Sequence, residues 1–308
     1  MTTSAPSPSS SRVWVDLVDP DEAALTAALP AGLHDSVIER LKDPTRHSDQ
    51  PRPRLESHGG YVIGVVVLPE RSGAEVVSRA VDVVLTGNCF YTIHNESTAD
   101  VLIELGQRVA AAGEVVPAMV LYFSMDLAAE RFLSMVDEFD FSINELEDHV
   151  DDLESRAVRK QIGDLRHAIL HTRRVLVPTR DTCRVVVDDR LDLESGLDMF
   201  DHSSQLFFAD VYDKLLRAAD SLDLCRDLLA GVRDYHQAEV ANNQNEVMKR
   251  LTVIASVLLL PTFIVGLYGQ NLKGMPESGF RYGYAFSWGL IITTTIAQLI
   301  FFRKKRWI

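Results

Sequence analysis

The stretch NEVMKRLTVIASVLLLPTFIVGLYGQN, residues 245–271, decides the fold because it leads from a polar helical segment into an uncharged run of membrane length. Residues 251–272 carry no formal charge, and neither do residues 282–302. A helix crosses the hydrocarbon core of a bilayer in about 20 residues. The sequence therefore predicts two C-terminal transmembrane helices, over 251–270 and 284–302, joined by an external loop over 271–283.

The basic residues beside these spans predict their orientation. Lys249 and Arg250 directly precede the first span, and the tail 303–308 begins with four basic residues, whereas the loop between the spans carries only two. Lys and Arg favour the cytoplasmic side of a membrane. We therefore expect both termini to be cytoplasmic and the protein to lie in the cell (inner) membrane, in contact with the lipid bilayer.

The overall charge limits the possible partners. The 308 residues contain 31 Lys and Arg against 44 Asp and Glu, for a net charge of −13. An acidic chain is a poor partner for nucleic acid, whose phosphates require a basic surface, whereas it suits divalent cations. No catalytic arrangement or strong phosphate-binding loop stands out. The sequence thus predicts a protein that is not an enzyme and has no resident cofactor.

The N-terminal part alternates strand and helix signals. Residues 1–12 are rich in Ser and Pro, lack the basic start and apolar stretch of a signal peptide, and are expected to be a disordered tail. Residues 13–18, 61–68, 76–85 and 89–94 have strand-like patterns. Residues 21–29, 35–41 and 101–112 have helical ones. We therefore expect a cytoplasmic α/β domain over residues 13–115.

Strand signals fade after Pro117, and long helical patterns follow. Pro178 and Gly196 are the expected interruptions, and residues 200–268 predict a single helix of about 65 residues, roughly 100 Å long at the helical rise. The fold class is thus an α+β membrane protein, with an N-terminal α/β domain, a stalk of long helices over 116–250 and two C-terminal transmembrane helices.

A strongly acidic segment lies within the stalk. Residues 137–154 hold nine carboxylates and no Lys or Arg. Two interpretations are open: a solvated helix face, or a charge that concentrates cations near an entrance.

The first span is polar or small along one face. Two rows of residues spaced seven apart lie on this face, as at the a and d positions of a heptad. The first row is Asn245, Thr252, Leu259 and Gly266, and the second is Met248, Ala255, Thr262 and Gly269. Small residues allow close helix packing in membranes. The alternative is a water-lined pore wall with apolar constrictions at Met248 and Leu259, where dewetting would gate the pore. Two spans cannot enclose a pore, so this alternative requires a ring of several copies.

Several motifs together resemble one known family. Residues 268–271 read Tyr-Gly-Gln-Asn, and Met-Pro-Glu follows at 275–277. This region resembles the pore-helix end of the CorA family of magnesium channels, which has Tyr-Gly-Met-Asn followed by Met-Pro-Glu. The resemblance extends, in family order, over WVDLVDP (14–20), GLH (32–34), RPRLE (52–56), YTIHNE (91–96), DVYDKLL (210–216) and RKKRW (303–307).

The resemblance implies a homopentamer of identical subunits around one central pore, which conducts divalent cations, Mg²⁺ as the transported ion and Co²⁺ as a second one. It implies a pore mouth and selectivity site at Gly269, Gln270 and Asn271. A mouth of neutral oxygens suits Mg²⁺, which releases its hydration water reluctantly. The resemblance also implies a pore lined by Asp234, Asn245, Met248, Leu251, Leu259 and Thr262, four of which the heptad pattern identifies independently.

The sequence departs from the family pattern at two places. Gln270 stands where the family has Met, which leaves the choice of ion open. The family's regulatory metal site lies between neighbouring subunits, and the resemblance places Glu39, Asp210 and Asp213 there, with Arg40 where an Asp is expected. A guanidinium repels a divalent ion and pairs with carboxylates. We therefore expect this site to be absent, or replaced by an ion pair between Arg40 and Asp210 of adjacent subunits.

Three functions remain open from the sequence. The first is a CorA-type channel for Mg²⁺. The second is a zinc transporter of the same fold, which the departures at Gln270 and Arg40 favour. The third, of another class, is a non-conducting membrane-anchored scaffold or cation sensor.

Overall fold

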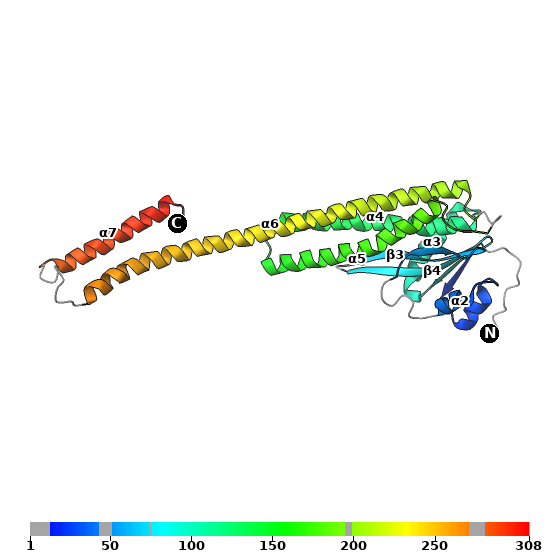
Figure 1. Ribbon diagram of the computed structural model, residues 1–308, viewed down its shortest axis with the longest axis horizontal. Helices are drawn as coiled ribbons and strands as arrows, with labels where there is room; N and C mark the ends of the chain where they lie inside the picture. Colours follow the sequence, from blue (N-terminus) through cyan, green and yellow to red (C-terminus); the bar gives the residue numbers. More distant parts are fainter. Residues whose placement is uncertain (1–12, 43–50, 74, 195–198, 271–280, 308) are drawn as a thin grey trace. The chain divides into compact units, whose positions relative to one another are not determined.

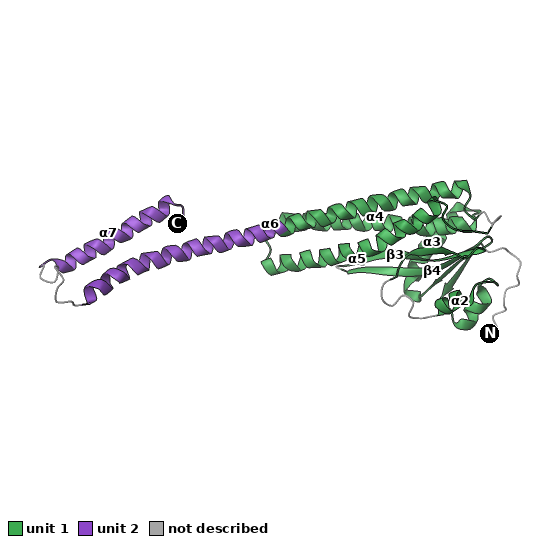
Figure 2. Cartoon of the chain, in the orientation of Figure 1, with its two compact units in different colours: residues 1–233 green, residues 234–308 purple. Residues whose placement is uncertain are grey.

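The computed structural model describes residues 13–42, 51–73, 75–194, 199–270 and 281–307. The chain divides into two compact units, residues 1–233 and residues 234–308 (Figure 2). Helix α6 (His202–Gly269) contributes residues to both units, and each unit is described by itself.

The first unit is built on a five-stranded mixed sheet with strand order β1-β5-β4-β3-β2. Its long strands β3 and β4 are labelled in Figure 1, next to the long helices of the same unit. The outer pair, β1 (Trp14–Val18) and β5 (Phe90–His94), is parallel. The strands β2 (Arg54–Ser57), β3 (Tyr61–Ser72), β4 (Glu75–Thr86) and β5 pair antiparallel in turn. The four predicted strands are confirmed. Strand β2 was not predicted because it is short and half of its residues are charged.

Helices cover both faces of the sheet because β3 and β4 are apolar on both. One face packs against the short helices α1 (Glu22–Ala28) and α2 (Asp35–Lys42) through a small cluster that includes Leu25, Leu41 and Ile63. The other face packs against long helices in a larger core, where Val62, Val66, Phe132 and Phe139 are fully or nearly fully buried. Burying such side chains stabilises a fold by about 1.5–3 kcal/mol each.

Two of the sequence motifs meet on the parallel strand pair. Asp16 lies opposite Thr92, and it accepts hydrogen bonds from Thr92 Oγ1 and from His94 Nε2, the latter at 3.1 Å. Burial alone would lower the pKa of His94, but its contacts with Asp16 and with the Asn95 carbonyl raise it. Burial likewise opposes ionisation of Asp16, yet the His94 and Thr92 hydrogen bonds lower its pKa. These motif residues stabilise the sheet edge.

After the 3₁₀ turn η1 (Glu96–Thr98) and helix α3 (Ala99–Ala112), the chain forms three long helices: α4 (Pro117–His149), α5 (Ser155–Val187) and α6. The predicted break at Pro178 is wrong, since this residue lies inside α5. A proline costs a helix interior about 3 kcal/mol, and the many buried side chains of α5 offset that cost. The chain turns instead at residues 150–154, and Gly196 lies outside the described residues. The single long helix predicted over 200–268 is confirmed.

The second unit consists of the C-terminal part of α6 and helix α7 (Gly283–Lys304). Both helices contain a stretch long and apolar enough to cross a membrane. They are tied by a polar contact, because Gln298 Nε2 of α7 donates to the Ser256 carbonyl of α6 at 3.2 Å. Val253 and Ile264 of α6 are buried on the same side.

Candidate ion pathway and regulatory residues

One face of α6 in the second unit packs toward α7. The buried or half-buried positions of this segment recur at helical spacing: Val253, Ser256, Val257, Leu260, Pro261, Ile264 and Tyr268. Residues three and four apart share a helix face. These residues therefore form one continuous stripe, which we call the α7-facing stripe.

The small and polar stripe found in the sequence lies on the other side of α6. Residues two apart on a helix point about 200° away from each other, so Ala255 and Thr262 project opposite Val257 and Ile264. Thr252, Ala255, Leu259, Thr262, Gly266 and Gly269 are all exposed. Helix α7 thus leaves this stripe uncovered, with two large apolar side chains on it, Met248 at 61% and Leu259 at 72% exposure.

The threonines on the stripe offer oxygen atoms outward. Thr252 Oγ1 donates to the Met248 carbonyl at 2.8 Å, and Thr262 Oγ1 donates to the Leu258 carbonyl at 2.7 Å. Their hydroxyl hydrogens are used within the helix, which leaves the oxygen lone pairs as acceptors. Neutral oxygens of this kind suit a hydrated cation or its water molecules.

The remaining residues predicted to line a pore also lie on exposed parts of α6. Asp234, Asn245 and Leu251 are exposed, with Leu251 at the start of the apolar segment. At the other end, Gly269 is the last residue of α6, and Gln270 follows in an exposed turn. Asn271, the third residue of the predicted mouth, lies outside the described residues.

Asp210, predicted for the regulatory site, is part of an ion cluster on the first unit that the sequence analysis missed. Lys214 Nζ lies 3.3 Å from Asp210 Oδ2 and 2.7 Å from Asp126 Oδ1, which belongs to α4. Arg108 of α3 approaches the other Asp126 oxygen at 3.4 Å and also pairs with Glu130 at 2.6 Å. The i, i+4 spacing of Asp210 and Lys214 was the available signal for the first of these pairs.

Lys214 is charged and firmly held in this cluster. Burial by itself lowers the pKa of an ammonium group, but the hydrogen bonds and charges of Asp126 and Asp210 raise the pKa of Lys214 above its ordinary value. The Asp126 side chain is only 9% exposed. The cluster therefore fastens α6 to α4, and Asp210 faces an ammonium group within its own chain.

The other predicted regulatory residues lie on two different helices of the chain. Asp213 is exposed one turn further along α6, and Glu39 is exposed on α2. Arg40 Nη1 lies 3.3 Å from Glu56 Oε2, so its partner here is Glu56. Across the described ranges of the chain, no group of three or more His, Cys, Asp or Glu is placed to hold a metal ion.

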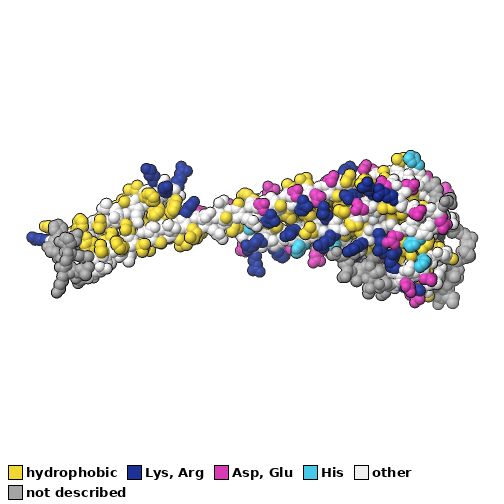
Figure 3. All heavy atoms as spheres, in the orientation of Figure 1, with side chains coloured by type: hydrophobic (Ala, Val, Ile, Leu, Met, Phe, Trp, Pro, Cys, Tyr) yellow, Lys and Arg dark blue, Asp and Glu magenta, His cyan; other side chains and the backbone are white. Residues whose placement is uncertain are grey.

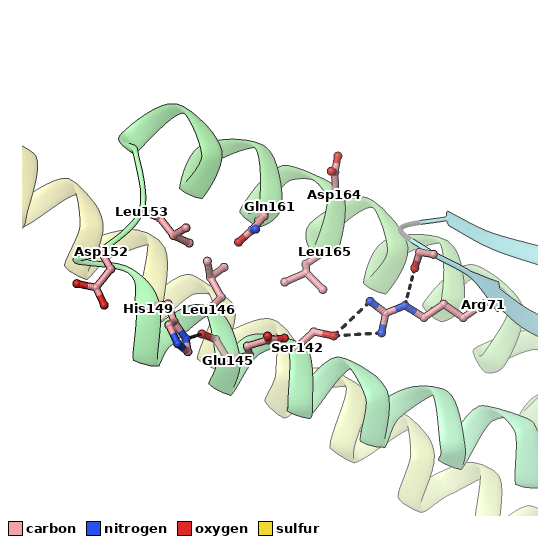
Figure 4. A pocket seen from close by; sticks show the side chains of 11 residues that line it. Arg71, Ser142, Glu145, Leu146, His149, Asp152, Leu153, Gln161, Asp164 and Leu165 are labelled. Atoms are coloured by element: carbon pink, nitrogen blue, oxygen red, sulfur yellow. Dashed lines mark hydrogen bonds between the residues drawn. The ribbon is translucent and has the colours of Figure 1, made fainter.

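A cavity of about 490 Å³ lies elsewhere, between the end of α4, the start of α5 and the β3–β4 turn (Figure 4). Arg71 reaches its edge, where the guanidinium donates to Ser142 Oγ at 3.3 Å and lies 5.2 Å from the centre of the Phe139 ring. None of the predicted site residues lines it.

Comparison with known proteins matches residues 9–305 to the family model described as CorA-like Mg²⁺ transporter protein. The chain belongs to the CorA family. A Bacillus subtilis protein named putative metal ion transporter YfjQ is 27% identical to this CorA-family chain over 96% of its length and 89% of the relative's. The cobalt/magnesium transport protein CorA of Thermotoga maritima is 26% identical, covering 90% and 77% of the two chains.

The fold of this CorA-family chain also matches a solved structure. The CorA magnesium transporter from Methanocaldococcus jannaschii superimposes with a TM-score of 0.79 at 20% identity, over 96% of this chain and 91% of that one. The CorA-family resemblance and the predicted fold class are therefore confirmed. The chain is a divalent-metal transporter and not an enzyme. It is a membrane protein with two C-terminal candidate spans, from a family that forms oligomeric channels.

Proposed function

We propose that this chain conducts Mg²⁺, and Co²⁺ as a second ion, through a homopentameric pore in the cell membrane, with both termini in the cytoplasm. The observation that carries the proposal is the uncovered stripe of α6. Its small and polar side chains lie opposite the α7-facing stripe. Several copies can therefore turn their stripes toward a common axis, with their α7 helices outside.

The proposed pore would bind the cation weakly at polar rings and would close at apolar constrictions. Asp234 and Asn245 would form rings below the membrane, and Thr262 a ring of hydroxyl oxygens within it. Met248, Leu251 and Leu259 would form apolar rings that gate by dewetting. In the sequence, Gly269, Gln270 and Asn271 would form the external mouth, where amide and carbonyl oxygens recognise the hydrated ion without stripping its water.

The membrane potential would drive uptake through such a pore. Moving a divalent cation inward gains about 4.6 kcal/mol per 100 mV of inside-negative potential. In this arrangement residues 13–115 and 116–250 form the cytoplasmic domain and stalk, residues 251–270 and 284–302 cross the membrane, and residues 271–283 lie outside.

We further propose that the family's regulatory metal site is absent. Within one chain Arg40 pairs with Glu56, and Asp210 pairs with Lys214, so both positions already have opposite charges beside them. A cation at either position would meet a positive group. Mg²⁺-dependent protection from protease that disappears in Asp210→Ala would contradict this proposal.

Zinc transport by the same fold is the second candidate, favoured by Gln270 at the exposed end of α6 where the family has Met. Flux into proteoliposomes separates the candidates. Uptake of Mg²⁺ that Co²⁺ competes with supports the first proposal, and selective Zn²⁺ uptake supports the second. No flux of any divalent ion would leave only a scaffold or sensor.

A further inference from the structure

The outer face of α5 is basic. Arg156, Arg159, Arg166 and Arg174 are all exposed and recur at helical spacing along this face. Within the described parts of the chain, Arg159 and Arg166 make no ion pair with a carboxylate. Lys and Arg side chains can be followed along α5 in Figure 3. We call this surface the basic flank.

The outer face of α4 is acidic and carries an exposed aromatic ring. Asp137, Phe141, Asn144 and Asp148 are exposed at i, i+4, i+7 and i+11, which places them on one side of the helix. Phe141 is 69% exposed. This ring lies among carboxylates, in a segment (137–154) without any Lys or Arg. We call this surface the acidic flank.

The two flanks point in opposite directions. The inner faces of α4 and α5 meet where Thr172 Oγ1 lies 3.2 Å from Met135 Sδ. Arg174 is two residues beyond Thr172, and Asp137 is two residues beyond Met135, so each projects about 200° away from that contact. Each unit of residues 1–233 therefore presents opposite charges on its two sides.

The α6 helix lies between these flanks. It is joined to α4 by the Lys214–Asp126 ion pair and to α5 by the Arg173–Asp223 ion pair at 3.1 Å. A copy that docks its acidic flank on a neighbour's basic flank brings α4 of one copy next to α5 of the other. Contacts between two different surfaces of the same chain generate closed rings when the rotation closes. A two-fold dimer through either flank would instead oppose like charges, which is unfavourable.

The levels of the charged residues along the helices also match. Helices α4 and α5 are antiparallel and touch at Met135 and Thr172. Asp148 lies thirteen residues after Met135, and Arg159 lies thirteen residues before Thr172. The two residues are therefore at about the same height along the helix axes. Six residues from the same contact lie Phe141 and Arg166. Rotation about an axis parallel to the helices preserves these levels. In such a ring the Asp148 carboxylate of one copy would face the Arg159 guanidinium of the next. The Phe141 ring would face the Arg166 guanidinium, which is a favourable cation–π pairing.

We propose that the basic flank of α5 binds the acidic flank of α4 from a second copy of this chain, with Asp148 opposite Arg159 and Phe141 opposite Arg166. This interface deepens the proposed function, because it rests on the ring that the pore requires. It names the surfaces that close the ring in the cytoplasm.

Charge reversal of the full-length protein in detergent tests the interface. Asp148→Arg and Arg159→Glu should each raise the concentration at which half of the oligomer dissociates by at least about tenfold, as measured by light scattering. The combined variant should restore wild-type assembly, since the pair is rebuilt with its charges exchanged. Glu114→Arg, an exposed reversal outside both flanks, should change nothing. Unchanged assembly in both single variants would overturn the proposal.

A disulfide provides an independent readout. Asp148→Cys combined with Arg159→Cys should give, under oxidation, a ladder of covalent oligomers in denaturing gels, because the two positions lie on opposite flanks of one chain. The absence of a ladder would also count against the interface. Ion flux distinguishes the two proposals: a wild type that conducts while these tests fail retains the proposed function and loses only the interface. A different outcome would be that the wild type binds anionic vesicles, and that Arg159→Glu abolishes this binding without changing assembly. That result would assign the basic flank to lipid instead.

Discussion

The ion cluster around Lys214 makes a strong prediction about the docking of α6 on the first unit. The substitution Lys214→Met removes the ammonium group that lies 2.7 Å from Asp126 and leaves this buried carboxylate with Arg108 at 3.4 Å. Removing one partner of a fully buried ion pair costs about 3–5 kcal/mol. Since Arg108 remains and Lys214 is 21% exposed, we expect a loss of about 2 kcal/mol.

Thermal unfolding of the detergent-solubilised protein measures this loss. For a domain of this size, 1 kcal/mol shifts the melting temperature by about 2–4 °C, so Lys214→Met should melt about 4–8 °C lower. The double variant Lys214→Met with Asp126→Leu should recover much of the loss, because no uncompensated carboxylate remains.

A matched control separates burial from charge. Lys42 pairs with Glu22 at the same 2.7 Å distance, but Glu22 is largely exposed to solvent. An exposed pair contributes about 0–1 kcal/mol, so Lys42→Met should shift the melting temperature by less than half as much. Equal shifts for the two single variants, or a double variant less stable than Lys214→Met, would refute the account of the cluster.

Substitutions at His94, Leu259 and Gly64 have expected outcomes that can each be measured. The folded state raises the pKa of His94, so the protonated imidazole stabilises the fold. This contribution is complete below the ordinary histidine pKa and is lost as the pH rises through the raised pKa. The melting temperature should therefore fall more between pH 6 and 8 in wild type than in His94→Asn. Leu259→Ser should increase resting Mg²⁺ flux by removing an apolar ring, and flux at or below wild type would argue against a gate there. Gly64→Ala directs a Cβ into the Arg54 carbonyl oxygen of β2 and should cost about 1–3 kcal/mol in denaturant unfolding, whereas unchanged stability would mean that β2 shifts freely.

Features with a strong local signal could be predicted from the sequence. The long α6 helix follows from an uninterrupted helical pattern, and the buried strand β3 follows from its run of β-branched residues, so both were expected. The small and polar stripe was visible as a heptad pattern. Only the structure shows that it lies opposite the side facing α7, because that depends on contacts such as Gln298 with Ser256.

Features that depend on distant partners could not be predicted. Strand β3 continues to Ser72 through Glu70 and Arg71, and the guanidinium of Arg71 bonds Ser142 far along the chain. Pro178 stays inside α5 because tertiary packing outweighs its local cost. Lys214 and Asp126 are 88 positions apart, so no local pattern reveals their contact.

The native cysteines allow a direct chemical test of whether the uncovered stripe of α6 lines a column of water. Cys89, Cys183 and Cys225 are buried, and burial raises the pKa of Cys183 to about 12 and that of Cys225 to about 11. Thiolates are the reactive form, so these residues give little background with water-soluble thiol reagents. Single cysteines can therefore be introduced into the wild-type chain.

The decisive measurement is the modification of Thr252→Cys, Ala255→Cys and Thr262→Cys by a charged thiol reagent in proteoliposomes, with ion flux recorded before and after. If the stripe lines water, all three cysteines should react and their modification should block flux. Ile264→Cys on the α7-facing stripe and Ile254→Cys on the exposed side away from the stripe should stay unmodified. Stripe cysteines that react no faster than these two controls would contradict the claim that α6 lines an aqueous pore.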